Sequence, residues 1–240
     1  MTPRTRTIAG FPVPGLLAFI GLIGAGYFVV VMLATVGIAT WGDVSTSTWE
    51  QGTELARLFA LFWVVWLIPT YLAPYVAHGV TRREFVASTV VFVVAEAALL
   101  AALVTAGYLV ERLVFEAADW PHVLTDDHAF GSPTHAATVF VSYGLTFLVW
   151  ASVGAMVTAG FYRHEGGWGL VALPVGILLL VPSDLAVDSG GPPFLEAFLD
   201  LGGGRLGLAL LLCLPSAALA LAGAWALLRD VPIRSKTPAA

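Results

Sequence analysis

The sequence predicts an all-α, polytopic integral membrane protein with six transmembrane helices. Hydrophobic residues make up 58% of the 240 residues and charged residues only 11%, whereas charged residues form about 25% of a typical soluble domain. The mean hydropathy is +0.87. The apolar residues gather in six runs, and a membrane-spanning helix uses about 20 such residues. This composition excludes a soluble globular domain and a disordered chain.

Charge and cysteine content exclude two further classes of protein. The formal net charge is −5 and no basic stripe is visible, which excludes a nucleic-acid-binding protein. A single cysteine excludes a disulfide scaffold. The chain is therefore expected to work in the lipid bilayer, without nucleic acid.

We expect residues 1–240 to form a single transmembrane domain, with spans near 14–40, 55–77, 85–110, 135–161, 168–181 and 206–228. The first run is about twice as long as the apolar part of a signal peptide, so it is expected to stay as a span. Pro69 and Pro74 in the second span and Pro174 in the fifth predict kinks, because proline removes a backbone hydrogen bond. Pro182 is expected to end the fifth span.

The basic residues predict the orientation, because Lys and Arg concentrate in cytoplasmic segments. With the N-terminus inside, eight of the eleven basic residues are cytoplasmic, and only Arg57, Arg112 and Arg205 fall in outer segments. Twelve of the sixteen acidic residues lie outside, among them Glu50, Glu54, Glu111 and Asp184. An even number of spans then places both termini in the cytoplasm. We expect a multi-pass protein of the cell inner (plasma) membrane of a bacterium.

The turn between the second and third spans carries the most specific pattern. Gly79 can end a helix in the left-handed conformation, and Thr81 with Glu84 three residues later has capping-box spacing. Arg82 and Arg83 follow in the first helical turn, where the helix dipole disfavours cations. Two interpretations are open. The arginines anchor a cytoplasmic turn, or the turn docks on a soluble partner.

A second span that ends in YVAHG, followed by VTRREF and a long third span, resembles the membrane subunits of type-2 ABC exporters. The resemblance implies a six-helix permease with both termini inside, in which the first cytoplasmic loop is the coupling helix that touches the ATPase subunit. By position, the coupling role falls on His78, Gly79, Val80, Thr81, Arg82, Arg83, Glu84 and Phe85. It also implies a homodimer or heterodimer of permease chains, with no catalytic residue in this one.

The nucleotide is expected on a separate polypeptide. A Walker A loop needs Gly-Lys-Ser/Thr, but the only lysine is Lys236, which follows Ser235. ATP and Mg therefore belong to a cytosolic ABC ATPase partner. The sequence also lacks His-Glu-x-x-His, Cys-x-x-Cys and Gly-x-Ser-x-Gly motifs. Two alternatives are an integral membrane enzyme that acts on lipids and a non-catalytic membrane accessory or immunity protein.

Glu96 is the second candidate site. It lies eleven residues after Phe85, which is about 16 Å along a helix and near the middle of a bilayer. An ionised carboxylate there is disfavoured by about 2.5 kcal/mol or more. The functional interpretation is substrate contact, proton coupling or a gating hydrogen bond, and in a lipid-acting enzyme Glu96 would be the acid or base. The structural interpretation is a hydrogen bond to Tyr143, Ser142 or Thr146 on the fourth span.

Two outer loops complete the prediction. Between the fifth and sixth spans, a short amphipathic helix is expected with Phe194, Leu195, Phe198 and Leu199 on its apolar face. It would lie at the interface or, following the family resemblance, form a re-entrant or lid-like helix. The other loop holds His122, Asp126, Asp127, His128 and His135. Its spacing fits no metal signature, so we expect a solvated acidic loop and no metal site.

Overall fold

The computed structural model describes residues 13–41, 46–120, 123–124, 135–163, 167–187 and 204–231. Within these residues the chain is helical, apart from an isolated β-bridge between Thr46 and Val123. The helices are α2 (Val13–Trp41), α3 (Thr48–Ala77), α4 (Arg82–Ala118), α5 (Ala136–Arg163), α6 (Gly167–Val187) and α8 (Gly204–Leu228). All six are long and apolar enough to cross a membrane. This confirms the predicted all-helical fold with six helices of membrane-spanning length, and it points to a multi-pass membrane protein.

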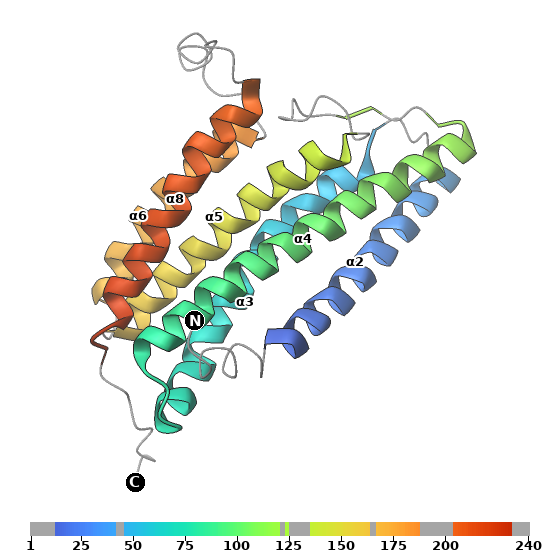
Figure 1. The fold of residues 1–240 in the computed structure, drawn as a ribbon. Coiled ribbons are helices and arrows are strands. Elements are labelled where there is room, and N and C mark those ends of the chain that lie inside the picture. The colour runs from blue at the N-terminus through green and yellow to red at the C-terminus, as the bar shows by residue number, and fades with distance from the viewer. Residues whose placement is uncertain are drawn as a thin grey trace.

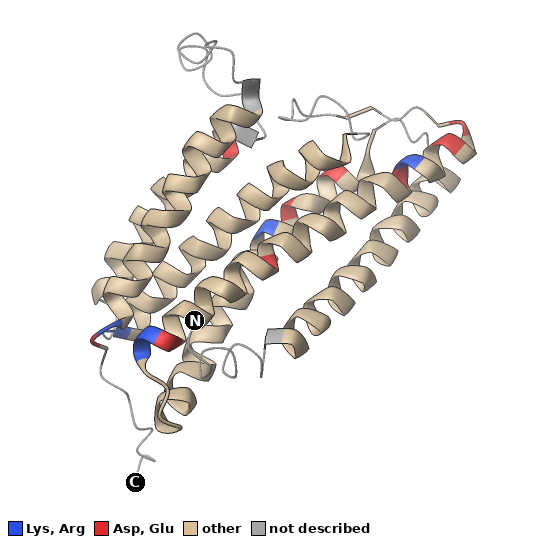
Figure 2. Cartoon of the chain, in the orientation of Figure 1, with Lys and Arg blue, Asp and Glu red and all other residues tan. Residues whose placement is uncertain are grey.

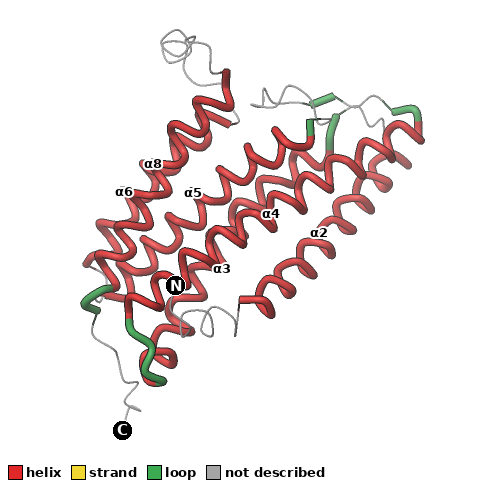
Figure 3. The backbone as a smooth tube through the Cα atoms, in the orientation of Figure 1, coloured by secondary structure: helices red, strands yellow, loops and turns green. Residues whose placement is uncertain are grey.

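The helices run up and down in one elongated bundle (Figure 1). The α3–α4 turn lies at one end of the bundle, hereafter the turn end. The start of α2 and the end of α8 lie toward the same end, while the end of α2 and the start of α3 lie at the opposite end. Figure 3 shows the same path, with α6 and α8 side by side along one flank and α2 along the other. Helices suit hydrocarbon surroundings because most of their backbone hydrogen bonds form within the same segment.

Helix α5 is the centre of the bundle. It packs against α3 and α4 on one side and against α6 and α8 on the other, and it is the most buried of the six helices. Gly154 permits the approach of α3, because a Cβ atom at this position would lie 2.8 Å from the carbonyl oxygen of Leu61. Helix α2 is the least buried helix and contacts α3 and α4.

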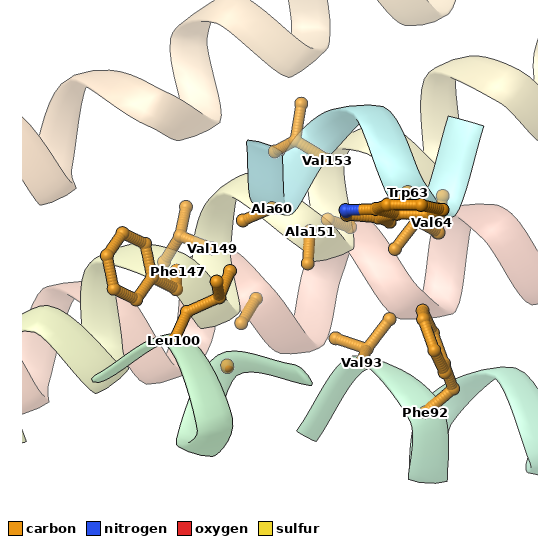
Figure 4. Close-up of a cluster of buried hydrophobic side chains, with 14 of the residues drawn as sticks. Ala60, Trp63, Val64, Phe92, Val93, Leu100, Phe147, Val149, Ala151 and Val153 are labelled. Carbon is orange, nitrogen blue, oxygen red and sulfur yellow. The ribbon is translucent and has the colours of Figure 1, made fainter. Parts of the chain in front are cut away.

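The apolar core lies where α3, α4 and α5 meet (Figure 4). The side chains in this cluster come from all three helices. They are Ala60, Trp63 and Val64 of α3, Phe92, Val93 and Leu100 of α4, and Phe147, Val149, Ala151 and Val153 of α5. Removing such side chains from water or lipid contact fixes these three helices against one another.

Several helix boundaries differ from the prediction. Helix α3 begins at Thr48 instead of near Leu55, because Ser47 caps it and accepts a hydrogen bond from the Glu50 N–H at 3.1 Å. Arg57, which we assigned to an outer segment, is therefore inside α3 and buried. Helix α6 does not end at Pro182 but continues to Val187.

Helix α4 is longer than a bilayer requires. Its 37 residues span about 55 Å at 1.5 Å per residue, whereas the hydrocarbon core of a bilayer is about 30 Å thick. The predicted span covered only 85–110, but the helix extends beyond it at both ends. Most of the extra length is at the end opposite the turn, where the helix continues to Ala118.

Candidate functional site

The turn between α3 and α4 has a defined structure. His78 caps α3, and Gly79 takes the left-handed conformation with φ +84°, as its place in the sequence predicts. The Val80 N–H donates to the Tyr75 carbonyl at 3.0 Å. The Nδ1 atom of His78 lies 2.7 Å from the Pro74 carbonyl oxygen. These local hydrogen bonds give the turn one shape without help from other helices.

The capping box at the start of α4 is confirmed. The Thr81 hydroxyl accepts from the Glu84 N–H at 3.3 Å, and the Glu84 carboxylate accepts from the Thr81 N–H at 2.9 Å. Both donors belong to the first turn, where helical N–H groups have no partner within the helix. The sequence pattern therefore gave the correct first residue of this helix, Arg82.

An aromatic row links the turn to the core. Phe85 is buried and its ring meets Tyr75 edge-on with centroids 6.0 Å apart. The row continues along α3 through edge-on pairs of neighbouring rings, with centroids 5.7 to 6.1 Å apart. Its members are Trp63, Trp66, Tyr71, Tyr75 and Phe85. Because Trp63 belongs to the core cluster, the row connects the turn to the middle of the bundle (Figure 4).

Arg82 and Arg83 have no acidic partner within the described residues. Arg83 is exposed, whereas Arg82 is half-buried and its Nε atom lacks a hydrogen-bond partner in that part of the chain. Both are at the start of α4, and Figure 2 shows basic residues at this end of the bundle. Cations in this first turn are disfavoured by about 0.3–1 kcal/mol. The turn therefore presents two positive charges that no acidic side chain of the described residues pairs with.

Charge is segregated between the two ends of the bundle (Figure 2). The described basic residues of the turn end are Arg82, Arg83, Arg163 and Arg229, while most described acidic residues lie in the opposite half. The sequence predicts this distribution, and the fold keeps it.

Glu96 is fully buried near the midpoint of α4. Neither carboxyl oxygen has a hydrogen-bond partner among the described residues. The structural interpretation drawn from the sequence is therefore wrong. Tyr143 bonds to Tyr108 and Thr53, and the Thr146 hydroxyl bonds to the carbonyl of Ser142. The side chain of Ser142 likewise makes no hydrogen bond in the described part of the chain.

A buried polar band at the opposite end was missed by sequence reasoning. Glu111 of α4 is fully buried and accepts from the Ser47 hydroxyl at 2.6 Å and the Trp49 N–H at 2.8 Å. The Tyr108 and Tyr143 hydroxyls are 2.8 Å apart, which joins α4 to α5. By sequence, Glu111 falls in an outer segment because it directly follows the predicted span 85–110, whereas the residue lies inside α4.

Arg57 extends this polar band to α6. Its guanidinium lies 3.1 Å from the Glu54 carboxylate and 3.4 Å from that of Asp184. One sequence signal could have located the start of the band, since Ser47 and Glu50 also have capping-box spacing. The partners on α4, α5 and α6 lie far away in the chain, so no local pattern indicates them.

The predicted outer helix with Phe194, Leu195, Phe198 and Leu199 lies outside the described residues. So does most of the His/Asp loop. Of that loop, His135 is described; it is exposed just before α5, and its carbonyl accepts the N–H groups of Thr138 and Val139.

Comparisons with family models, with curated proteins and with solved structures found no match. The function must therefore be argued from the turn, from Glu96 and from the distribution of charge.

Proposed function

We propose that this chain is the membrane-spanning permease subunit of an ATP-driven, ABC-type exporter. It would couple a separate cytosolic ATPase to the movement of substrate across a bacterial inner membrane. One observation carries the proposal: the turn at residues 78–85 is held by local hydrogen bonds and presents Arg82 and Arg83 without an acidic partner among the described residues. The likeness of YVAHG and VTRREF to type-2 ABC exporters supports the same assignment.

The position of the arginines favours docking over simple anchoring. A cytoplasmic anchor needs positive charge anywhere in the short connection. Here the charges stand inside the first helical turn, where the N–H dipoles oppose them. An acidic surface on a partner would offset this opposition and would bind the two guanidinium groups by charge-assisted hydrogen bonds.

Charge segregation supports the proposed orientation. The turn end holds most of the described basic residues and would face the cytoplasm. The acidic opposite end would face outward. A cytosolic ATPase would then meet the turn directly.

The aromatic row supplies a mechanical link. Phe85 sits immediately after the charged residues and contacts Tyr75, from which ring contacts lead along α3 to Trp63. Closure of the ATPase would move the turn and, through these contacts, rock α3 and α4. Pro69 and Pro74 inside α3 weaken its backbone hydrogen bonding and so permit bending. The substrate path would lie between two permease chains, either two copies or one copy and a related chain.

The proposal is tested by co-purification from mild detergent, using tagged protein from membranes of its native host. Wild type is compared with Arg83→Glu and with the double variant Arg82→Glu, Arg83→Glu. Arg83 is exposed and makes no ion pair in the described chain, so its replacement should leave the fold intact. Arg229→Glu is the matched control, because Arg229 is exposed at the same end but outside the turn.

We expect a P-loop ATPase, identified by mass spectrometry, to co-purify with wild type and with Arg229→Glu. It should be reduced by Arg83→Glu and lost from the double variant. Absence of any ATPase from the wild-type preparation would contradict the proposal. An equal loss with Arg229→Glu would show that general charge, and not the turn, binds the partner.

A further inference from the structure

The carboxyl group of Glu96 is enclosed by the core of the bundle. Its side chain is fully buried, and neither oxygen finds a hydrogen-bond donor among the described residues. Val93 and Leu100, which flank it on the same face of α4, belong to the apolar cluster between α3, α4 and α5 (Figure 4). A carboxylate in such a place would lack both water and a counter-ion.

The register of α3 against α4 shows what lies opposite Glu96. The rings of Tyr75 and Phe85 meet toward the turn end, and the Trp49 indole donates to the Val104 carbonyl toward the other end. Glu96 lies between these two contacts, which places the part of α3 from Arg57 to Val64 opposite it. Within that part, the Arg57 guanidinium is bonded to Glu54 and Asp184. That segment contributes apolar side chains to the cluster.

No charged side chain of the neighbouring helices compensates Glu96. The described titratable or charged residues on the helices that pack against α4 are Tyr27 of α2; Glu50, Glu54, Arg57, Tyr71 and Tyr75 of α3; Tyr143, Tyr162 and Arg163 of α5; and Cys213 of α8. None makes a hydrogen bond or ion pair with Glu96 in the described structure. The buried cation Arg57 is directed to Glu54 and Asp184.

We propose that Glu96 is a proton-binding site, a carboxyl group that holds its proton while α4 is packed against α3 and α5. When α4 separates enough for water to enter, the carboxyl O–H bond breaks and the proton passes to water. The carboxylate is then hydrated, and it takes up a proton again before the helices close. Each opening and closing would release and recover one proton at this position.

This inference goes beyond the proposed transport role and does not depend on an ATPase partner. A purely structural residue at this position would be leucine or alanine, as elsewhere in the cluster. A glutamate whose carboxyl group makes no hydrogen bond among the described residues adds no contact that an apolar residue of similar size would lack. Its distinguishing property is that it can bind and release a proton.

The direct test is infrared spectroscopy of the full-length protein in lipid vesicles at neutral pH. Glu96→Gln is the comparison variant, because an amide has nearly the shape of a neutral carboxyl group. We expect the wild-type spectrum to contain a protonated carboxylic acid carbonyl band that is lost in Glu96→Gln. The matched control is Glu116→Gln, an exposed glutamate on the same helix, which should remove a carboxylate band instead.

Chemical labelling of the wild-type protein gives a second measurement that needs no variant. The protonated carboxyl adds across one C=N bond of dicyclohexylcarbodiimide: its oxygen bonds to the central carbon and its proton moves to nitrogen. An oxygen-to-nitrogen acyl shift then leaves a stable N-acylurea that carries the mass of one reagent molecule. We expect this apolar reagent to label Glu96, and a charged, water-soluble carbodiimide to label Glu116 and spare Glu96.

If Glu96→Gln instead loses a carboxylate band, Glu96 is ionised in the closed bundle and the proposal is overturned. This holds whether water or a reoriented Arg57 stabilises the negative charge. Labelling of Glu96 by the water-soluble reagent in preference to the apolar one would overturn it as well. If Glu96→Gln fails to fold, judged by its elution in size-exclusion chromatography, the preference between the two reagents on the wild-type protein decides the question.

Discussion

The carboxylate of Glu111 on α4 caps the first turn of α3 by accepting the backbone N–H of Trp49 at 2.8 Å. Its second oxygen accepts the hydroxyl of Ser47, the N-cap residue, at 2.6 Å. A negative charge at a helix N-terminus is favoured by the dipole and by the unpaired N–H groups there. One buried side chain of α4 thus adds to the Ser47 cap at the start of α3 and joins the two helices at the end opposite the turn.

Replacing Glu111 with leucine should destabilise the bundle. Two hydrogen bonds to a charged acceptor are lost and the buried donors of Ser47 and Trp49 are left unpaired, so we expect a loss of about 2–3 kcal/mol. Glu111→Gln keeps one acceptor and should lose less. The apparent thermal midpoint in detergent, at one heating rate, measures the effect. Glu116→Gln, exposed one turn later, is the control; an equal shift there would show that Glu111 has no special role.

Gly154 gives a second prediction, because it sets the separation of α3 and α5. A Cβ atom would lie 2.8 Å from the Leu61 carbonyl oxygen, which is backbone and cannot turn aside. We expect Gly154→Ala to force the helices apart and destabilise the protein by about 1–3 kcal/mol. Gly21→Ala is the matched control, since a Cβ atom there meets nothing within 4 Å. Thermal midpoints of the two variants should differ clearly; similar midpoints would mean that α3 can shift without penalty.

Much of the fold was predictable because it depends on local composition. Six apolar runs appear as six helices, since each backbone must satisfy its own hydrogen bonds in lipid. The start of α4 was also predictable, because Thr81 and Glu84 are three residues apart and act on the same helical turn.

The buried polar band was not predictable from local pattern. Ser47 and Glu111 are 64 residues apart, and Arg57 and Asp184 are 127 residues apart. Charged residues near the ends of apolar runs look like loop residues in a sequence. Arg57 and Glu111 are nevertheless inside helices and bond across the bundle. The same limit explains the error at Glu96, whose three expected hydroxyl partners turned out to bond elsewhere or to nothing in the described chain.

The capping box gives a prediction at the turn itself. Thr81→Ala removes the acceptor for the Glu84 N–H, and loss of an N-cap hydroxyl typically destabilises a helix by about 1 kcal/mol. Because the turn is at the end of α4, the effect should be local. Faster hydrogen exchange is expected at the amides of residues 82–85, with little change in thermal midpoint. Ser88→Ala removes a hydroxyl that bonds only within the helix and should leave these amides unchanged. Unchanged exchange in Thr81→Ala would contradict a capping role.

The aromatic row predicts that docking and coupling can be separated. Phe85→Leu leaves Arg82 and Arg83 in place and keeps most of the buried volume, so stability should fall by less than about 1.5 kcal/mol. It removes the ring that contacts Tyr75, and with it the link from the turn to Trp63.

If the turn docks an ATPase as proposed, the ATPase should still co-purify with Phe85→Leu, but its stimulation by the permease should fall several-fold. Phe140→Leu, a partly exposed phenylalanine near the start of α5, should retain both properties. If Phe85→Leu stimulates the ATPase as fully as wild type, the movement of the turn reaches the bundle without the Phe85–Tyr75 contact. Loss of co-purification would place Phe85 in the docking surface, because only a residue that shapes the contact itself could weaken binding when both arginines remain.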